Sequence, residues 1–494
     1  MQLPLPIHES NLDAGASDVP RRHRLFVNRN LRFDLVTAVG FDMDYTLAIY
    51  RQEAMDQVSI EVTAQKLVEL HGYPEALLRA PYRADFPIRG LLIDKKLGNI
   101  LKMDRYRYVK KGYHGMRELT REDRSKLYHS RPVRVGSSRY HWVDTLYGLS
   151  EVAVYGGAIQ QLDEMGIEVD HHKLFDDIRQ SIDAAHQDGS ILNRITGDKE
   201  HYLLRDPELP PTLHKLKSSG KKLFLVTNSQ PAYTEEMMSF LFAGQLNGYS
   251  SWRAYFDVIV TAAKKPRFFT EESIPFESAE PGLAAPVHGF ERGRLYKGGC
   301  ISELHRLFAS ETDRVLYVGD HIYGDVLRAK KDSAWRTAMV IQEMDHELRV
   351  LDAVAPLLER MDEVESMRDL LHEELRSRLA VLRHLERELD SAREAGRSTT
   401  EIGTLRMGHK RAVDRLKRRL RDLDVEHEEL EVRVDGSFHP FWGSLFKAGA
   451  EVSLFGAQVE QYACLYTDRV SNLSQYSPLH YFRSPRDRMP HEMF

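Results

Sequence analysis

The chain is poor in cysteine and has no long run of apolar residues. Only Cys300 and Cys464 occur in 494 residues, too few and too far apart for a disulfide framework, which indicates a reducing compartment. No Cys/His spacing typical of a zinc site is present. No segment approaches the roughly 20 apolar residues of a membrane span, and the polar amino terminus lacks the apolar core of a signal peptide. We therefore expect a cytoplasmic protein that does not bind a membrane.

Positive charge is not in excess. The net charge is −5 at pH 7, so the composition gives no reason to expect nucleic-acid binding. A basic stretch at 417–421 alternates with Asp414, Asp422 and Asp424, which favours a solvated helix face over a nucleic-acid patch. The length predicts two or three domains with sizeable cores.

Two carboxylates one residue apart follow the apolar run at 35–40. The segment reads Phe41-Asp42-Met43-Asp44-Tyr45-Thr46-Leu47, and the run before it predicts a buried strand. Open α/β sheets bind ligands at the carboxyl ends of their strands. An Asp-x-Asp-x-Thr pattern at such a strand end resembles the signature of haloacid-dehalogenase-like phosphohydrolases. The alternative is an ordinary strand end with solvated acids.

Three later strand ends carry matching chemistry. The run at 222–226 ends in Thr227, Asn228 and Ser229, whose hydroxyl and backbone N–H groups suit a phosphate oxygen. After the run at 256–260 comes Lys265, which can offset phosphoryl charge but taken alone also fits a solvated surface.

The last strand end, after 315–319, brings two acids five residues apart. Asp320 and Asp325, placed beside Asp42, form a hard oxygen site suited to Mg²⁺. The ordered set of four strand ends is far more specific than any one of them. The residues support two-step phosphoryl transfer, in which Asp42 attacks phosphorus and forms an aspartyl phosphate while Asp44 acts first as acid and then as base.

The spacing of these motifs predicts the domains. About 165 residues separate the first strand from the second, far more than a βα connection needs, so we expect an inserted cap that closes over the pocket. We predict a Rossmann-like α/β core with a parallel sheet in residues 1–50 and 216–345. An α+β cap with the purine pocket then covers 51–215.

A helical region is expected at 346–494. Leucines and other apolar residues recur at three- and four-residue spacing over 371–389 and 413–430, on either side of a break that contains Gly396, Gly403 and Gly408. That pattern predicts a helical hairpin, followed by a tail that returns to the core. The apolar seam of the hairpin can pack either against its own subunit or against another one.

The extended motifs resemble the cytosolic purine 5'-nucleotidase family, the IMP- and GMP-preferring branch of the haloacid dehalogenase superfamily. The similarity runs from His23-Arg24-Leu25-Phe26-Val27-Asn28-Arg29 through Gly40-Phe41-Asp42-Met43-Asp44-Tyr45-Thr46-Leu47-Ala48, Lys265-Pro266-Arg267-Phe268-Phe269 and Gly319-Asp320-His321-Ile322-Tyr323-Gly324-Asp325 to Met489-Pro490-His491-Glu492. It implies a Mg²⁺-dependent hydrolase of purine nucleoside 5'-monophosphates. IMP, GMP and their deoxy forms would be preferred.

The resemblance also implies roles for individual residues. One Mg²⁺ would be held by Asp42, the backbone carbonyl of Asp44 and Asp320, with Asp325 orienting a bound water. Thr227, Asn228 and Ser229 would bind phosphate oxygens, and Lys265 would supply countercharge.

The cap helix at 174–186 resembles the helix that reads the base in the family. Arg179 and Asp183 would hydrogen-bond a 6-oxopurine, His186 would line the pocket, and Tyr147 would stack on the base. Taken by pattern alone, the same helix fits a polar outer face and Tyr147 fits core packing. Gln187 and Leu192 replace an aromatic residue and a lysine of the vertebrate pattern.

An effector site for ATP or GTP is a further implication. Tyr323 takes the position of an aromatic residue that stacks on the effector base, and Arg134, Lys331 and Gln458 match its polar neighbours. Asp144 replaces an asparagine of the family pattern, which removes an amide donor and adds a charge that repels phosphate. The resemblance also leads us to expect a homo-oligomer, a dimer or a tetramer.

Two alternatives stay open. The same aspartyl phosphate can pass to a nucleoside hydroxyl, which would make the protein a nucleoside phosphotransferase. A catalytically weak scaffold acting through its hairpin is the second, although the complete set of catalytic residues argues against it.

Overall fold

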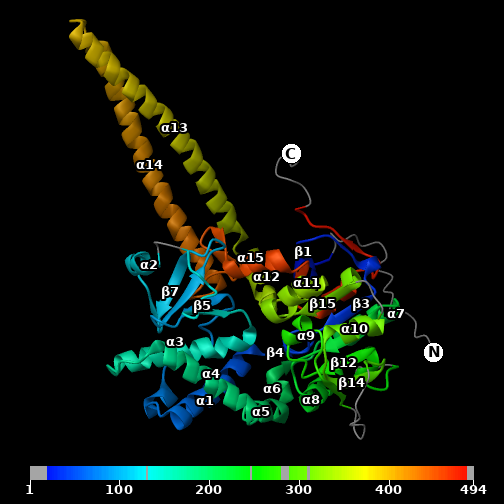
Figure 1. The fold of residues 1–494 in the computed structure, drawn as a ribbon. Helices are drawn as coiled ribbons and strands as arrows, with labels where there is room; N and C mark the ends of the chain where they lie inside the picture. The colour runs from blue at the N-terminus through cyan, green and yellow to red at the C-terminus, as the bar shows by residue number, and fades with distance from the viewer. Residues whose placement is uncertain (1–18, 129–131, 245–247, 280–288, 309–311, 487–494) are drawn as a thin grey trace. The chain divides into compact units, whose positions relative to one another are not determined.

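The computed structural model describes residues 19–128, 132–244, 248–279, 289–308 and 312–486. The chain forms two compact units, Met1–Asp345 with Leu445–Phe494 and His346–Ser444 (Figure 1). The predicted C-terminal region, 346–494, is thus longer than the second unit, because residues from 445 onward pack with the first. No helix of the described ranges combines the length and apolar character that crossing a bilayer requires.

The core of the first unit is a mostly parallel sheet, with nine strands among the described residues. Across the sheet these are β1 (Phe26–Val27), β19 (Leu465–Thr467), β16 (Arg336–Val340), β15 (Val315–Gly319), β3 (Ala38–Phe41), β11 (Lys222–Val226), β12 (Val258–Thr261), β14 (Arg294–Gly298) and β13 (Phe276–Ser278). Only the edge pairs β1–β19 and β13–β14 are antiparallel. From β3 the chain continues to β11 on one side and later to β15 on the other. This reversal makes the carboxyl end of β3 a ligand site.

Aromatic packing fixes the sheet around β3. A Cβ atom at Gly40 would lie 2.2 Å from the Phe224 ring, so only glycine fits there. Phe224 in turn packs on Tyr317 and Trp335, and Phe268 joins the same buried cluster. The helices of this core are α7 (Leu209–Ser218), α8 (Pro231–Phe242), α9 (Arg267–Thr270), α10 (Ile301–Phe308), α11 (Arg328–Ser333) and α15 (Leu454–Tyr462).

The segment between β3 and β11 forms the cap. A short antiparallel pair, β4 (Ile49–Tyr50) with β10 (Leu203–Leu204), connects it to the core. The cap has its own antiparallel sheet of β8 (Arg117–Glu118), β7 (Val109–His114), β6 (Asn99–Met103), β5 (Leu91–Asp94) and β9 (Tyr140–Val143). Its main helices, which contact one another, are α1 (Gln52–His71), α3 (Leu149–Glu164) and α4 (His171–Gln187). α2 (Arg121–Tyr128), α5 (Leu192–Gly197) and α6 (Lys199–Tyr202) are shorter.

Residues after the hairpin return to the core. β19 pairs in parallel with β16, and β20 (Tyr481–Phe482) pairs with β2 (Leu31–Arg32) near the start of the described chain. β17 (Lys447–Ala448) and β18 (Glu451–Val452) form a small antiparallel pair of their own. The tail therefore supplies a strand to the central sheet.

The second unit is a long helical hairpin. α13 (Ala355–Glu394) and α14 (Thr400–Phe438) follow the shorter α12 (Met344–Ala353). They pack along a seam that includes buried Val364, Leu423 and Leu430. The turn lies at Gly396, which has φ +64°, whereas Gly403 and Gly408 lie inside α14. The predicted break was therefore too long, because packing along the seam outweighs the roughly 1 kcal/mol that a helical glycine costs.

Candidate active site

The four predicted strand ends meet at the carboxyl edge of the sheet. Lys265 Nζ lies 2.8 Å from Asp42 Oδ1 and 2.7 Å from Asp325 Oδ1. Ser229 Oγ donates to Asp44 Oδ2 at 2.5 Å. Side chains from segments after β3, β11, β12 and β15 therefore contact one another.

A buried ammonium group joins two carboxylates at the centre. The side chain of Lys265 is only 4% exposed. Burial alone would lower the pKa of Lys265, but the carboxylates of Asp325 and Asp42 raise it well above its usual value. The two carboxylates thus favour the charged form of Lys265. Burial raises the pKa of Asp42 well above its usual value; the Lys265 charge opposes that shift, and the neighbouring acids add to it.

Three carboxylates form a group that could hold a metal ion. Oxygen atoms of Asp42, Asp320 and Asp325 lie within 4.8 Å of one another, and all three residues are buried. Burial and the Asp325 charge raise the pKa of Asp320 to about 7. Buried carboxylate oxygens are the ligands that Mg²⁺ takes in proteins, so this donor set fits the predicted ion. The Asp44 carboxylate is not part of the group.

The loop that carries these acids is closely packed. A Cβ atom at Gly319 would lie 2.6 Å from the Asp325 Cβ, so glycine is required before Asp320. Asp325 lies in a π-helical turn, η8 (Ile322–Leu327), a local geometry often found at functional sites. Buried Arg89 of the cap segment donates to the Asp320 carbonyl at 3.0 Å. Its guanidinium is held by both carboxylate oxygens of Glu343.

Asp44 sits in a different environment from Asp42. It accepts hydrogen bonds from Tyr50 Oη at 2.6 Å and from Ser229 Oγ at 2.5 Å, and Tyr50 in turn lies 3.0 Å from Tyr233 Oη. Burial raises the pKa of Asp44 despite these two donors. A raised pKa favours the protonated form that a general acid needs.

The loop after β11 differs in detail from what the sequence predicted. The Thr227 hydroxyl accepts from the Ser229 N–H at 3.1 Å, so that N–H is not a free phosphate donor in this conformation. Hydroxyl side chains commonly make such local turns. The Asn228 amide group donates to the Lys265 carbonyl and accepts from the Lys265 N–H. Asn228 therefore holds the backbone of the lysine that neutralises Asp42.

The predicted base-reading residues lie on α4 and on a 3₁₀ turn (Leu146–Gly148) that precedes α3. The Tyr147 ring lies 4.7 Å from the His186 ring, and Tyr147 Oη is hydrogen-bonded to His186 Nδ1 at 2.7 Å. Tyr147 is 44% exposed, so it is not a core residue. Burial of its hydroxyl raises the pKa of Tyr147, and Asp44 and Asp183 add to the effect. Tyr147 thus lies within electrostatic reach of both the catalytic loop and α4.

Arg179 and Asp183 have a neighbour that the sequence did not reveal. Glu151, on α3, is buried and lies 3.9 Å from Arg179 Nε. Burial raises the pKa of Glu151 to about 7. The Arg179 charge opposes this rise, and the Asp183 charge adds to it. Four-residue spacing from Tyr147 was the available signal for Glu151. The Arg179 Nη1 also lies 3.4 Å from His141 Nδ1, whose pKa burial lowers to about 4.

The predicted effector residues are not joined to one another by any hydrogen bond or ion pair within the described ranges. The Arg328 guanidinium carbon lies over the Tyr323 ring, 4.7 Å from the ring centre. Lys331 Nζ lies 5.8 Å from the centre of the Tyr462 ring. Gln458 Oε1 is buried without a partner, while Arg134 is exposed.

Asp144 instead pairs with the metal loop. Its Oδ2 lies 3.2 Å from His321 Nε2. Burial would lower the pKa of His321, but Asp144, Asp325 and Asp320 together raise it to about 9. The acid that replaces asparagine is therefore matched by a cation.

Comparison with known proteins identifies the family. Residues 25–494 match the model of the 5' nucleotidase family. The chain belongs to this family. A 5'-nucleotidase domain-containing protein of Dictyostelium discoideum is 28% identical over 477 residues, which cover 95% of this chain and 74% of that protein. The family and enzyme class predicted from sequence are thus confirmed: the protein is a 5'-nucleotidase, a phosphatase of nucleoside monophosphates.

Solved structures are similar at low identity. A β-phosphoglucomutase from Pyrococcus sp. strain ST 04 is 14% identical, with 62% of this chain and 86% of that chain covered and a TM-score of 0.29. The HAD-hydrolase YfnB of Bacillus subtilis, bound to magnesium, is 13% identical, with 62% and 88% covered and a TM-score of 0.20. The parallel core with its inserted cap confirms the predicted haloacid dehalogenase-type fold.

Proposed function

We propose that this 5'-nucleotidase hydrolyses purine nucleoside 5'-monophosphates, preferring IMP, GMP and their deoxy forms, through an aspartyl phosphate on Asp42. The observation that carries the mechanism is the contrast between two aspartates two positions apart. Asp42 contacts the Lys265 ammonium group, whereas Asp44 is held by two hydroxyls. An ionised nucleophile and a protonated acid are what the two roles need.

In the first step, an Asp42 carboxylate oxygen forms a bond to phosphorus as the bond to the nucleoside 5'-oxygen breaks. Asp44 gives its proton to that departing oxygen. In the second step, the Asp44 carboxylate takes a proton from water as the water oxygen attacks phosphorus and restores Asp42. Lys265 neutralises charge on the phosphoryl oxygens throughout, and Thr227 lies at the same strand edge to bind them.

Asp42, Asp320 and Asp325, with the backbone carbonyl of Asp44, would hold one Mg²⁺. When bound, that ion lets two anions approach each other and polarises the phosphoryl oxygens. Arg89 holds the Asp320 backbone in place through its carbonyl.

The purine preference rests on polar groups around Tyr147. Arg179 can donate to O6 of hypoxanthine or guanine, and Asp183 can accept from the protonated N1. Adenine offers an acceptor at N1 and a donor at C6, so the same pair would be left unsatisfied. Glu151 supports this arrangement, because its carboxylate orients the Arg179 guanidinium.

A nucleotide panel tests the proposal. With Mg²⁺ present, phosphate release should be fastest for IMP, GMP and dIMP, and slower for AMP, UMP and CMP. Equal efficiency on AMP and IMP would refute the reading of the base while leaving the phosphatase intact. No release from any nucleotide would favour the scaffold alternative. Labelled inosine added with IMP measures transfer to a nucleoside, and exchange that outpaces phosphate release would assign a phosphotransferase.

A further inference from the structure

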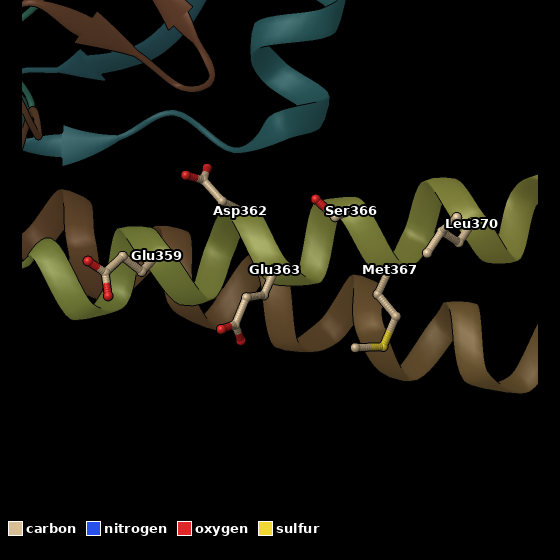
Figure 2. A pocket seen from close by; sticks show the side chains of 6 residues that line it. All are labelled: Glu359, Asp362, Glu363, Ser366, Met367 and Leu370. Carbon is tan, nitrogen blue, oxygen red and sulfur yellow. The ribbon is translucent and has the colours of Figure 1, made fainter.

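The helical hairpin carries a groove along α13. Figure 2 shows its lining on one stretch of this helix. The lining residues recur at three- and four-residue spacing and are Glu359, Asp362, Glu363, Ser366, Met367 and Leu370. Leu370 is 73% exposed. One end of the groove is therefore acidic, and the other end is apolar.

A basic row on α14 borders the groove. Arg411, Arg415 and Arg419 are four residues apart and share one helix face. The Arg419 Nη2 atom lies 3.9 Å from Met367 Sδ, so the row begins beside the groove. Because α14 runs back from the turn at Gly396, Arg415 and Arg411 lie progressively closer to that turn. The acidic end of the groove extends the opposite way.

Most of these opposite charges have no ion-pair partner in the described part of the chain, although Glu363 pairs with Arg360 at 2.8 Å. Neither Glu359 nor Asp362 forms an ion pair there, and neither Arg411 nor Arg415 does. Elsewhere the two helices pair their charges across the seam, as in Arg368–Asp424 and Arg406–Glu386. Unpaired exposed charges are ordinary on a solvated helix. Here they form two blocks of opposite sign along the hairpin, separated by an exposed leucine.

We propose that this side of the hairpin binds the same side of a second copy of the chain, antiparallel, with a two-fold axis near Leu370. The Met367–Arg419 contact places Leu370 approximately level with Arg419. Asp362 is eight residues before Leu370, and Arg411 is eight residues before Arg419, so both lie about 12 Å from the axis at 1.5 Å per residue.

Rotation about that axis therefore brings the acidic block of one copy onto the basic row of the other, twice. Leu370 meets its own symmetry mate at the centre, where an apolar contact leaves no charged group unpaired. Such a self-complementary patch is what an isologous dimer requires. The chain carries the complement of its own groove, which selects a second copy over an unrelated basic partner.

Charge exchange tests the surface in the full-length protein. Glu359→Lys/Asp362→Lys and Arg411→Glu/Arg415→Glu should each weaken self-association by roughly tenfold or more, from several exposed pairs lost together. A mixture of the two variants should restore self-association, because in the mixed dimer each block of one variant again faces a block of opposite charge on the other. Sedimentation equilibrium over a protein concentration series measures all three. Glu365→Lys/Glu394→Lys, an equal charge change on α13 outside the groove, is the control.

Three results would overturn the proposal. They are a wild type that stays monomeric at tens of micromolar, a mixture that fails to re-associate, and a control that dissociates as far as the groove variants. Circular dichroism of each variant verifies that the helices remain folded.

A cysteine on the axis tests the register independently. Leu370→Cys should form a disulfide-linked dimer under mild oxidation, since the two copies of this position meet. Ser377→Cys lies on the same helix seven residues away, about 10 Å from the axis, and should not. The native Cys300 and Cys464 are buried. Equal cross-linking of the two variants, or none for Leu370→Cys, would overturn the two-fold arrangement.

Discussion

Replacement of Asp44 by asparagine probes the division of labour between the two aspartates. Asparagine has almost the same shape, and its Oδ1 can still accept from Tyr50 Oη. Its amide group can donate to Ser229 Oγ, because a hydroxyl accepts as well as donates. The pocket is therefore preserved, and substrate binding should change little. In the proposed mechanism, what disappears is the proton that Asp44 gives in the first step and takes in the second.

Loss of general acid–base catalysis costs about 10²- to 10⁴-fold in rate, or about 3–5 kcal/mol of barrier. We therefore expect kcat for IMP to fall by at least about 100-fold in Asp44→Asn, with a small change in KM. The defect should differ between the two steps when the leaving group needs no proton. With p-nitrophenyl phosphate, formation of the aspartyl phosphate should stay fast while its hydrolysis slows.

Stopped-flow absorbance then gives a decisive result. Asp44→Asn should release one equivalent of p-nitrophenolate per active site in a burst, followed by slow turnover, and acid quenching should trap phosphate on the protein. Asp44→Asn that retains more than about a tenth of the wild-type kcat on IMP would refute the role of Asp44. A slow release without a burst would refute the covalent route. Tyr233→Phe, which removes a hydroxyl one bond further away, should have a much smaller effect.

Three other predictions follow from the structure, and a fourth follows from the family resemblance. Asp42→Asn should abolish turnover. Its melting temperature should stay close to that of the wild type, because Lys265 keeps its ion pair with Asp325. Asp183→Asn should lower kcat/KM for IMP about tenfold to hundredfold, as one mismatched polar partner costs about 1–3 kcal/mol, and should lower that for AMP less; equal losses would contradict base reading. Burial raises the pKa of Asp56 to about 8. The protonated side chain therefore stabilises the fold fully below about pH 4, and this stability is lost as pH rises through about 8. Asp56→Asn should raise the melting temperature at about pH 8.5 and have little effect near pH 4. Tyr323→Ala should weaken stimulation by ATP or GTP, and a wild type whose rate millimolar nucleotide leaves unchanged would argue against an effector site.

The sheet was predictable where strands are buried on both faces. The runs at 222–226 and 315–319 coincide with β11 and β15, because almost every side chain there is buried and the apolar run has clear ends. The first strand was placed three residues too early. Phe33–Leu35 forms a 3₁₀ turn before β3, and Leu35 is 48% exposed, so an apolar residue outside the core extended the apparent strand.

The meeting of the acids and the lysine at the candidate site was predictable for a topological reason. Parallel strands end at one edge of the sheet, so Asp42, Lys265 and Asp325 could be expected to meet although they lie far apart in sequence. The supporting residues carry no such signal. Arg89 and Glu151 come from the cap, and their contacts with Asp320 and Arg179 depend on how the cap folds and docks within the first unit. Neither residue stands at a strand end or within a recognisable motif.

The two aspartates of one motif have different partners, and most of these partners are far away in the sequence. Thr46, Leu47 and Ala48 all donate backbone N–H groups to the Met43 carbonyl, which turns the chain sharply between the strand and the cap. Asp42 stays at the sheet edge, where a lysine after β12 reaches it. Asp44 is carried toward Ser229 and Tyr50, which offer neutral donors instead of a charge. A hydroxyl stabilises a carboxylate less than an ammonium does. Burial raises the pKa of both carboxyl groups, and only Asp42 contacts the Lys265 ammonium group, which opposes the rise. The fold thus gives the two carboxyl groups of one motif different partners, as the proposed division into an acid and a nucleophile requires.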